Sequence, residues 1–447
     1  MSADPAVIVI GAGVAGLAAA CQLGRAGLSV KVVEARDRIG GRVFTKFDSD
    51  CDCPIELGAE FIHGKPPEIW ELLRKAPTDI TEVHGDAWCV EEGSLSPCGF
   101  WEDVDEILEK IDDSKPDESF AHLLEGCCRS PKTRAKQRAK QRATSYVSGF
   151  NAADPALVGV HWLMKGMRAE EKIEGQRAFR SRHGYGDLLD VLQHELKAYN
   201  ILLRTETVVE AVDWNVAGVK VQLRDPSGTA TLEARRVLIT VPLSLLKASP
   251  GQPGAIRFTP ELPQSKKEAL DRLEMGKVIR VTLRFRKRFW DAIKPPNSKR
   301  SLSGMSFLFG QDDLFPTWWT ASPAKWPIIT GWAPFRCAER LSGCEQGVVV
   351  AQALHSLSVM LRVNQSEIES VLESGHVHDW QTDPFSLGAY SYGKVGADGA
   401  QETLAEPIEG TLYFAGEATD ITGHNGTVHG AIASGYRAAH QILKAAG

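Results

Sequence analysis

The sequence contains no apolar run that approaches the roughly 18 residues needed to span a membrane. It opens without a charged and apolar leader, and it ends without a peroxisomal address or a lipidation cysteine. We therefore expect a soluble, cytoplasmic protein with no membrane partner.

Metal-binding cysteine patterns are also lacking. The nine cysteines show no repeated spacing of the kind that holds zinc. Reduced thiols are the interpretation we favour, and they are typical of an intracellular protein. No metal is expected.

The sequence also lacks a large excess of either basic or acidic residues: 51 basic and 57 acidic residues leave a net charge of -6. This balance gives no reason to expect nucleic acid, and it slightly favours cationic small molecules. The one basic run, Arg129 to Arg142, alternates at every second residue, so its charges gather on no single helical face. It is predicted to be a solvated helix or loop.

What is present begins with a strand–helix–strand pattern. Val7 to Ile10 is an apolar run of buried-strand type, Val14 to Ala26 has helical spacing, and Leu28 to Val33 is a second apolar run. Far along the chain, Thr411 to Ala415 predicts another buried strand, and a helix follows from about Val428 to Ala446.

A chain of 447 residues is too long for one ordinary core, so two domains are expected. The order of the patterns predicts an α/β fold with a Rossmann-like domain interrupted by a second, mixed-sheet and helical domain. We assign 1–85, 196–254 and 381–447 to the first domain, and 86–195 and 255–380 to the second. The sequence does not set the oligomeric state.

A glycine-rich turn lies between the first strand and helix. Gly11 permits a tight turn, Gly13 lets a pyrophosphate approach the helix N-terminus, and Gly16, after Ala15, lets helix pack on strand. Glu34 ends the second strand, where a carboxylate accepts the ribose hydroxyls and disfavours the 2′-phosphate of NADP. FAD and NAD remain as candidates.

A second basic and glycine-rich loop follows in Glu34-Ala35-Arg36-Asp37-Arg38-Ile39-Gly40-Gly41-Arg42 and decides for FAD. With this loop, the stretch through Gly58 to Gly64 and the C-terminal stretches Tyr413 to Glu417 and Thr427 to Ala431, the chain resembles the flavin-containing amine oxidases. Trp380 to Tyr392 and, more loosely, Gly276 to Trp290 add to the match.

The resemblance implies a set of cofactor contacts. Arg36, Gly41 and Arg42 would help to hold the FAD phosphates, the backbone of Gly58, Ala59, Glu60 and Phe61 would line the flavin, and Val209 would contact the adenine side. Trp380 is also implied near the flavin, while Gly416, Glu417, Thr427 and Val428 would meet the ribityl and pyrophosphate portion.

Noncovalent FAD is expected because Ala389 stands where monoamine oxidases carry the cysteine that bonds to the flavin. On the substrate side, Tyr390 is similar to one wall of their aromatic cage. Thr427 replaces the second tyrosine, so a longer or bulkier amine should fit. His63 is similar to a histidine of acetylpolyamine and spermine oxidases, and it is a candidate to bind a distal amine or deprotonate the substrate.

Arg280 stands where many of these oxidases have a lysine over flavin N5. Arginine stays protonated and forms different hydrogen bonds from lysine. The reduced flavin therefore need not react with oxygen as it does in those oxidases. Lys277 should point to the other face of the strand.

The resemblance thus implies FAD-dependent oxidation of an amine, a polyamine first, with oxygen giving hydrogen peroxide. One alternative is an L-amino-acid or monoamine oxidase, of which the amino-acid oxidase is disfavoured because Glu60-Phe61-Ile62 offers no arginine for a carboxylate. The other is a flavoprotein dehydrogenase or noncatalytic FAD-binding protein, which Arg280 motivates.

Overall fold

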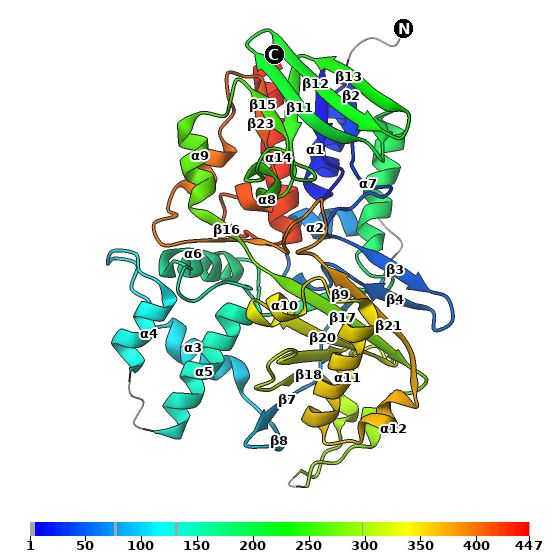
Figure 1. Ribbon diagram of the computed structural model, residues 1–447, viewed down its shortest axis with the longest axis vertical. Helices are drawn as coiled ribbons and strands as arrows, with labels where there is room; N and C mark the ends of the chain where they lie inside the picture. The colour runs from blue at the N-terminus through cyan, green and yellow to red at the C-terminus, as the bar shows by residue number, and fades with distance from the viewer. Residues whose placement is uncertain (1–4, 76–77, 130–132, 297, 447) are drawn as a thin grey trace.

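The computed structural model describes residues 5–75, 78–129, 133–296 and 298–446, and it has the predicted α/β fold (Figure 1). A five-stranded parallel sheet gathers strands from the start, middle and end of the chain. In spatial order its strands are β10 (Leu202–Arg204), β2 (Val30–Val33), β1 (Val7–Ile10), β14 (Arg236–Ile239) and β23 (Leu412–Phe414). The predicted opening strand–helix–strand unit is confirmed.

Helices cover one face of this sheet, in the upper part of Figure 1. They are α1 (Val14–Arg25), α2 (Pro67–Leu73), α7 (Gly186–Ala198) and α14 (Val428–Ala446). Helices α1 and α14 pack so closely that a Cβ added at Gly435 would lie 2.3 Å from the carbonyl oxygen of Ala15. The two ends of the chain therefore share one core.

A four-stranded sheet covers the other face. Side chains alternate along a strand, so Val7 and Val9 point to the helices while Ile8 and Ile10 point to this second sheet. Its strands in spatial order are β13 (Gly228–Ala234), β12 (Gly218–Asp225), β11 (Val208–Asn215) and β15 (Arg257–Thr259).

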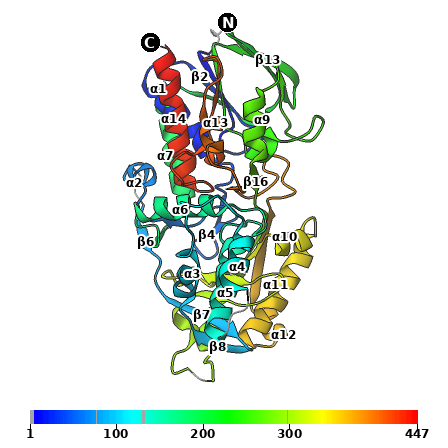
Figure 2. The same ribbon diagram turned by 90° about the vertical axis from the view of Figure 1, so that its left-hand side faces the viewer.

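The lower part of the molecule is built on a seven-stranded mixed sheet. Its strands in spatial order are β21 (Leu372–Asp379), β17 (Val278–Phe285), β20 (Ile328–Pro334), β19 (Thr317–Thr320), β18 (Met305–Phe309), β7 (Asp86–Glu91) and β8 (Ser94–Pro97). Trp88 packs in the core that contains α11 (Gln346–Leu361), whereas Cys89 packs in the core of α3 (Phe100–Leu108) and α5 (Arg134–Gly149). Figure 2 shows these two helical groups on opposite sides of the sheet.

Shorter elements complete the fold. The short strands are β3 (Thr45–Asp48), β4 (Cys53–Glu56), β5 (Ile62–His63), β6 (Ile80–Glu82), β9 (Ala178–Ser181), β16 (Leu273–Met275) and β22 (Ser391–Gly393). The remaining helices are α4 (Phe120–Cys128), α6 (Val160–Glu171), α8 (Leu243–Leu246), α9 (Gln264–Asp271), α10 (Arg336–Leu341), α12 (Gln365–Glu369) and α13 (Ala400–Ala405). Single 3-10 turns are η1 (Phe289–Ala292), η2 (Leu302–Gly304) and η3 (Glu417–Thr419).

Two segments make contacts across the expected domain boundaries. Helix α7 packs on α1 and α2, and β15 pairs with β11. We therefore propose that 186–198 and 257–259 be counted with the first domain.

The basic run forms a helix from Arg134, while its Lys132 lies outside the described residues. The last residue of the run, Arg142, is not exposed to solvent, contrary to the prediction. Arg142 is buried, with Nη1 2.6 Å from Asp103 and Nη2 2.5 Å from Glu91. The helix turns this side chain toward α3, which alternation in sequence could not reveal.

The prediction of reduced thiols is wrong at four positions. Disulfides join Cys51 to Cys53 and Cys89 to Cys98. The β7–β8 hairpin brings the second pair to a Cα–Cα distance of 5.6 Å, which suits a bridge. The inference from thiols to an intracellular location therefore fails at these cysteines. Separately, among the described residues no helix has the length and apolar character to cross a membrane.

Candidate functional site

The glycine turn is shaped as its sequence predicts. Gly11 has φ +103°, a conformation that favours glycine, and a Cβ at Gly16 would lie 2.1 Å from the Gly11 carbonyl oxygen. A Cβ at Gly13, by contrast, would meet nothing within 4 Å. Gly13 is the N-cap of α1 and no side chain caps this end, so the helix offers backbone N–H groups to an anion in open space.

Glu34 supports this turn from the end of β2. Its buried carboxylate accepts hydrogen bonds from the Ala12 N–H at 2.7 Å and from the Arg36 N–H, after Ala35, at 2.9 Å. The Arg36 guanidinium pairs with Asp383 at 2.5 Å. Although burial acts to raise it, the pKa of Asp383 is lowered, because His378 and Arg36 stabilise the carboxylate.

Arg42 ties three distant segments together. Its Nη1 donates to Glu417 Oε1 at 2.8 Å and to the Ala389 carbonyl at 2.9 Å. Glu417 is buried, and its other oxygen accepts from the Ser391 hydroxyl at 2.6 Å and the Gly426 N–H at 2.9 Å. Glu417 is therefore a buried, paired acid and not an exposed loop acid, and its contact with FAD stays a prediction.

Glycines allow close approach around this ion pair. A Cβ at Gly41 would lie 3.3 Å from the Gly13 Cα, and one at Gly58 would lie 1.9 Å from the Arg42 carbonyl oxygen. Gly416 adopts φ +120° and donates its N–H to Ser434 at 2.9 Å. The two glycine-rich loops and the C-terminal loop are thus held at short range.

Glu60 sits between two buried guanidinium groups. Arg180 Nε lies 2.7 Å from it, Arg280 Nη2 pairs with it, and the Trp319 indole donates to it at 2.9 Å. Burial acts to raise its pKa, but the two arginines prevail and lower it. Arg280 Nη1 also donates to the Gly58 carbonyl at 3.0 Å. A cavity of about 30 Å³, the share of one water in the liquid, adjoins this cluster.

Two of the residues expected to contact FAD lie in this region, whereas a third, Val209, lies in the core between the two sheets of the first domain. Ala59 donates its N–H to the Arg42 carbonyl at 3.1 Å. The Trp380 indole donates to the Leu57 carbonyl at 3.0 Å. Val209 is buried in β11, in the core shared with the parallel sheet.

On the substrate side, Tyr390 lies beside the turn before α14. Its hydroxyl donates to the Phe150 carbonyl at 2.5 Å, and a Cβ at Gly426 would lie 3.4 Å from its ring. Burial raises the pKa of Tyr390, so its hydroxyl stays neutral. Thr427 caps α14: its hydroxyl accepts the Gly430 N–H at 2.9 Å and donates to the His424 carbonyl at 2.6 Å.

His63 ends β5, its ring 6.1 Å from that of Phe61. It also lies near a histidine to which no role was assigned. Burial, helped by His424 and His63, holds the pKa of His429 well below its usual range. His429 directly follows Val428 in the first turn of α14.

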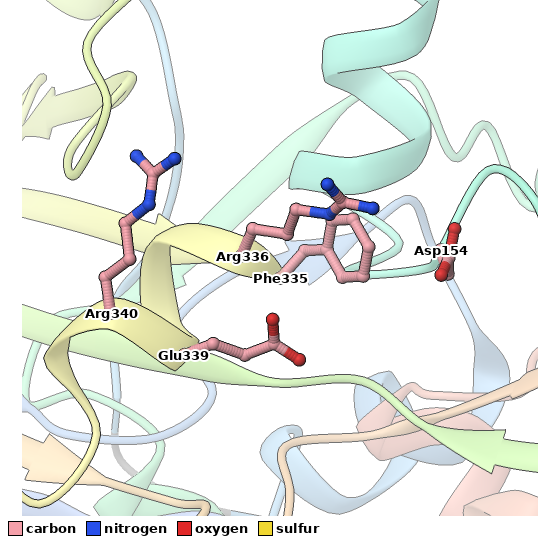
Figure 3. A pocket seen from close by; sticks show the side chains of 5 residues that line it. All are labelled: Asp154, Phe335, Arg336, Glu339 and Arg340. Carbon is pink, nitrogen blue, oxygen red and sulfur yellow. The ribbon is translucent and has the colours of Figure 1, made fainter.

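A surface cavity of about 460 Å³ lies apart from these groups (Figure 3). It is lined by Asp154, Phe335, Arg336, Glu339 and Arg340. None of these is a predicted site residue. Lys277 donates to Glu339 at 2.6 Å, so its side chain points toward this cavity. Arg280 points the other way, toward Gly58, as predicted for two residues on opposite faces of the strand.

Several residues of this region escaped the sequence analysis. Arg180 comes from the middle segment without a recognisable motif, and Phe150 contributes a carbonyl, which no side-chain pattern reveals. His429 stood within a quoted motif, and its position one residue after Val428 was the available signal.

Comparisons with known proteins agree with this arrangement. The sequence profile described as "Flavin containing amine oxidoreductase" matches residues 14–91 and 103–443. Polyamine oxidase 4 of Oryza sativa subsp. japonica is 28% identical over 99% of this chain and 89% of its own length. Lysine-specific histone demethylase 1 homolog 2 of Arabidopsis thaliana is 29% identical over 99% of this chain, which spans only 59% of that protein.

Solved structures share the fold. Wild-type putrescine oxidase bound to putrescine superposes with a TM-score of 0.79 at 20% identity, covering 98% of this chain and 99% of the other. Cyclohexylamine oxidase from Brevibacterium oxydans gives a TM-score of 0.78 at 22% identity, covering 99% of both chains.

Proposed function

The chain belongs to the flavin containing amine oxidoreductase family, and from this premise we propose that it oxidises small amines, polyamines first. It is an oxidoreductase whose cofactor is FAD. Similarity to polyamine oxidases over nearly the whole chain supports the substrate class. The observation that carries the proposal is the Arg42–Glu417 pair, which joins both chain ends beside the open N-terminus of α1.

The residues present fit FAD. Open space at Gly13, the carboxylate of Glu34 and the cation of Arg42 match the needs of a pyrophosphate and a ribose. When bound, FAD supplies the acceptor for a hydride from the amine, and oxygen then takes up the two electrons as hydrogen peroxide. The imine product hydrolyses in water.

The chain's own groups position the amine and keep water away. A ring face at Tyr390 attracts a cation and guides it toward the site. Its hydroxyl is engaged by Phe150, so it serves as a wall rather than as a proton carrier. We assign the proton-accepting and distal-amine roles to His63.

Amino acids are disfavoured as substrates. Arg180 stacks its guanidinium over the ring of Phe61, 4.4 Å from the ring centroid. Its nitrogens are already engaged by Glu60, the Ser322 carbonyl and the Thr320 carbonyl. A substrate carboxylate would therefore have to compete with these three partners for the Arg180 guanidinium.

A dehydrogenase is the second candidate, and the fixed position of Arg280 favours it. The side chain is held by Glu60 and Gly58, so it does not act as the lysine that the resemblance places over flavin N5 in many related oxidases. We propose noncovalent FAD in either case, since Ala389 has no nucleophile.

Anaerobic stopped-flow mixing tests the proposal. The purified holoenzyme is mixed with spermine, spermidine, acetylated polyamines, benzylamine and common amino acids, and bleaching of oxidised flavin is followed. We expect polyamines to bleach it fastest, and Tyr390→Ala to slow bleaching while the remote variant His161→Ala does not. Reoxidation by oxygen with stoichiometric peroxide identifies an oxidase, and slow reoxidation a dehydrogenase. If no amine reduces the flavin, the proposal fails.

Noncovalent attachment is tested separately by acid precipitation. All flavin should remain in the supernatant, and flavin in the protein pellet would contradict the assignment.

A further inference from the structure

Two imidazoles and a carboxylate converge beside the start of α14. His424 lies in the loop before this helix, His429 lies in its first turn, and Glu170 lies near the end of α6. One possible ligand atom from each of the three lies within 4.8 Å of the others.

The histidines have unused nitrogens. His429 is only 3% exposed, and its Nε2 has no hydrogen-bond partner among the described residues. The buried Nδ1 of His424 likewise lacks a partner within the described part of the chain. Their rings meet edge to face with centroids 4.5 Å apart. A buried polar atom without a partner is costly, so each nitrogen points to a missing ligand.

The backbone holds this group in place. The His424 N–H donates to Asp420 at 2.9 Å, and its carbonyl accepts the Thr427 hydroxyl at 2.6 Å. A Cβ at Gly423 would lie 2.8 Å from the Lys165 carbonyl oxygen, so the loop packs directly on α6. The loop and both helices therefore bring the three side chains together through short, fixed contacts.

We propose that Glu170, His424 and His429 form a binding site for a divalent transition-metal ion of the zinc class. Two imidazoles with one carboxylate are a ligand set that zinc accepts, with a fourth position left for water. Tetrahedral ligands at about 2.0–2.1 Å from zinc lie about 3.3 Å apart. Because the three atoms lie within 4.8 Å of one another, metal binding requires them to draw closer by up to about 1.5 Å. This inference does not depend on which amine is oxidised.

Zinc titration by equilibrium dialysis tests the site. The FAD-loaded protein carries Cys127→Ser and Cys344→Ser in every sample, because these exposed thiols would bind zinc themselves. We expect one zinc per chain, and at least about 100-fold weaker binding in Glu170→Gln and His424→Asn, since even outer-shell partners change affinity 10–100-fold.

The matched control is His122→Asn, which removes an exposed histidine that lies 2.6 Å from Glu118. It should bind zinc as the parent does. Bound flavin absorbance, measured in each variant, separates loss of the site from loss of folding. Co²⁺ should give a tetrahedral ligand-field spectrum that disappears in His424→Asn.

Three results would overturn the proposal. They are absence of zinc binding to the flavin-loaded parent, equal affinity in the Glu170 and His424 variants, and equal loss in the His122 control. If the Glu170 and His424 variants weaken spermine binding but leave zinc binding unchanged, these residues bind the amine substrate and not a metal ion.

Discussion

Glu60 shows how this protein keeps a charge beneath its candidate active site. The acid is compensated by Arg180 and Arg280, and all three side chains are largely buried. Taking one partner away leaves a buried charge less well paired, which is costly. The cluster is therefore a structural support for the Gly58–Phe61 backbone.

Replacing Arg280 by methionine should lower the free energy of unfolding by about 1.5–3 kcal/mol, the range for hydrogen bonds to charged groups. The control is Lys277→Met, because the Lys277–Glu339 pair is about half exposed, at 47% and 44%, and should contribute at most about 1 kcal/mol. Urea unfolding of both FAD-loaded variants measures the difference. Equal losses would show that the Glu60 cluster is not a special support.

Glu56 provides a test by pH. Its carboxylate oxygens accept from the Tyr185 N–H at 2.7 Å and the Thr45 hydroxyl at 2.8 Å, but burial dominates and raises its pKa to about 8. An unfolded glutamate ionises near pH about 4.3. The stability from this raised pKa is therefore complete below that pH and is lost as pH rises to about 8.

Glu56→Gln stays neutral at every pH. The Tm of this variant relative to that of the parent should therefore increase from pH 5 to pH 8.5, because only the parent loses stability as the pH approaches the raised pKa of Glu56. The exposed control Glu92→Gln should show a constant difference. A Tm difference that does not vary with pH for Glu56→Gln would mean that this carboxyl is ionised in the folded protein.

Residues whose role depends on local sequence were the predictable ones. The turn at Gly11, Gly13 and Gly16 follows from backbone geometry, and Arg42 and Glu417 from motifs. Arg180 and Glu170 could not be predicted, because their partners lie on segments far away in the chain. The Cys89–Cys98 bridge was missed for a similar reason: it depends on a hairpin whose register the spacing does not reveal.

At the scale of elements, the contact between α1 and α14 governs the cofactor domain. Gly435→Ala places a methyl group 2.3 Å from the Ala15 carbonyl oxygen, so the helices must separate. Overpacking of this kind costs about 1–3 kcal/mol or more. The control is Gly126→Ala in α4, where a Cβ meets nothing within 4 Å and should stabilise by about 0.5–1 kcal/mol.

Thermal unfolding of both variants, with FAD retention measured after gel filtration, checks this pair. Gly435→Ala should unfold at a lower Tm than the parent and should retain less FAD after gel filtration. A Gly435 variant as stable as the parent would show that the helices can move apart without cost.

The sequence predicted a start of α14 at about Val428, where the structure has it, and assigned no capping role to Thr427. Its hydroxyl serves the Gly430 N–H, so Thr427→Ala should destabilise by about 1 kcal/mol and Thr427→Ser should not. Differential scanning calorimetry of the two variants decides, and equal destabilisation by both would refute the capping role.

At the scale of the whole molecule, the parallel sheet explains why the matching motifs lie so far apart in sequence. Strands β1 and β23 flank β14, although they come from opposite ends of the chain. The seven-stranded sheet takes β7 and β8 from one middle segment and the remaining strands from another. The α/β class and the discontinuous order were predictable from patterns, whereas the crossings at α7 and β15 depend on tertiary contacts.

This architecture predicts one cooperative response to the cofactor. FAD at about 100 times its Kd stabilises the protein by about 2.7 kcal/mol. Because both chain ends form the site, hydrogen exchange should slow together in α1, β2 and α14 when FAD is added to apoprotein. Helix α11, in the core of the other sheet, should change less. Protection confined to α1 and β2 would mean that the C-terminal helix does not take part in holding the cofactor, and that the Arg42–Glu417 pair joins the chain ends for stability alone.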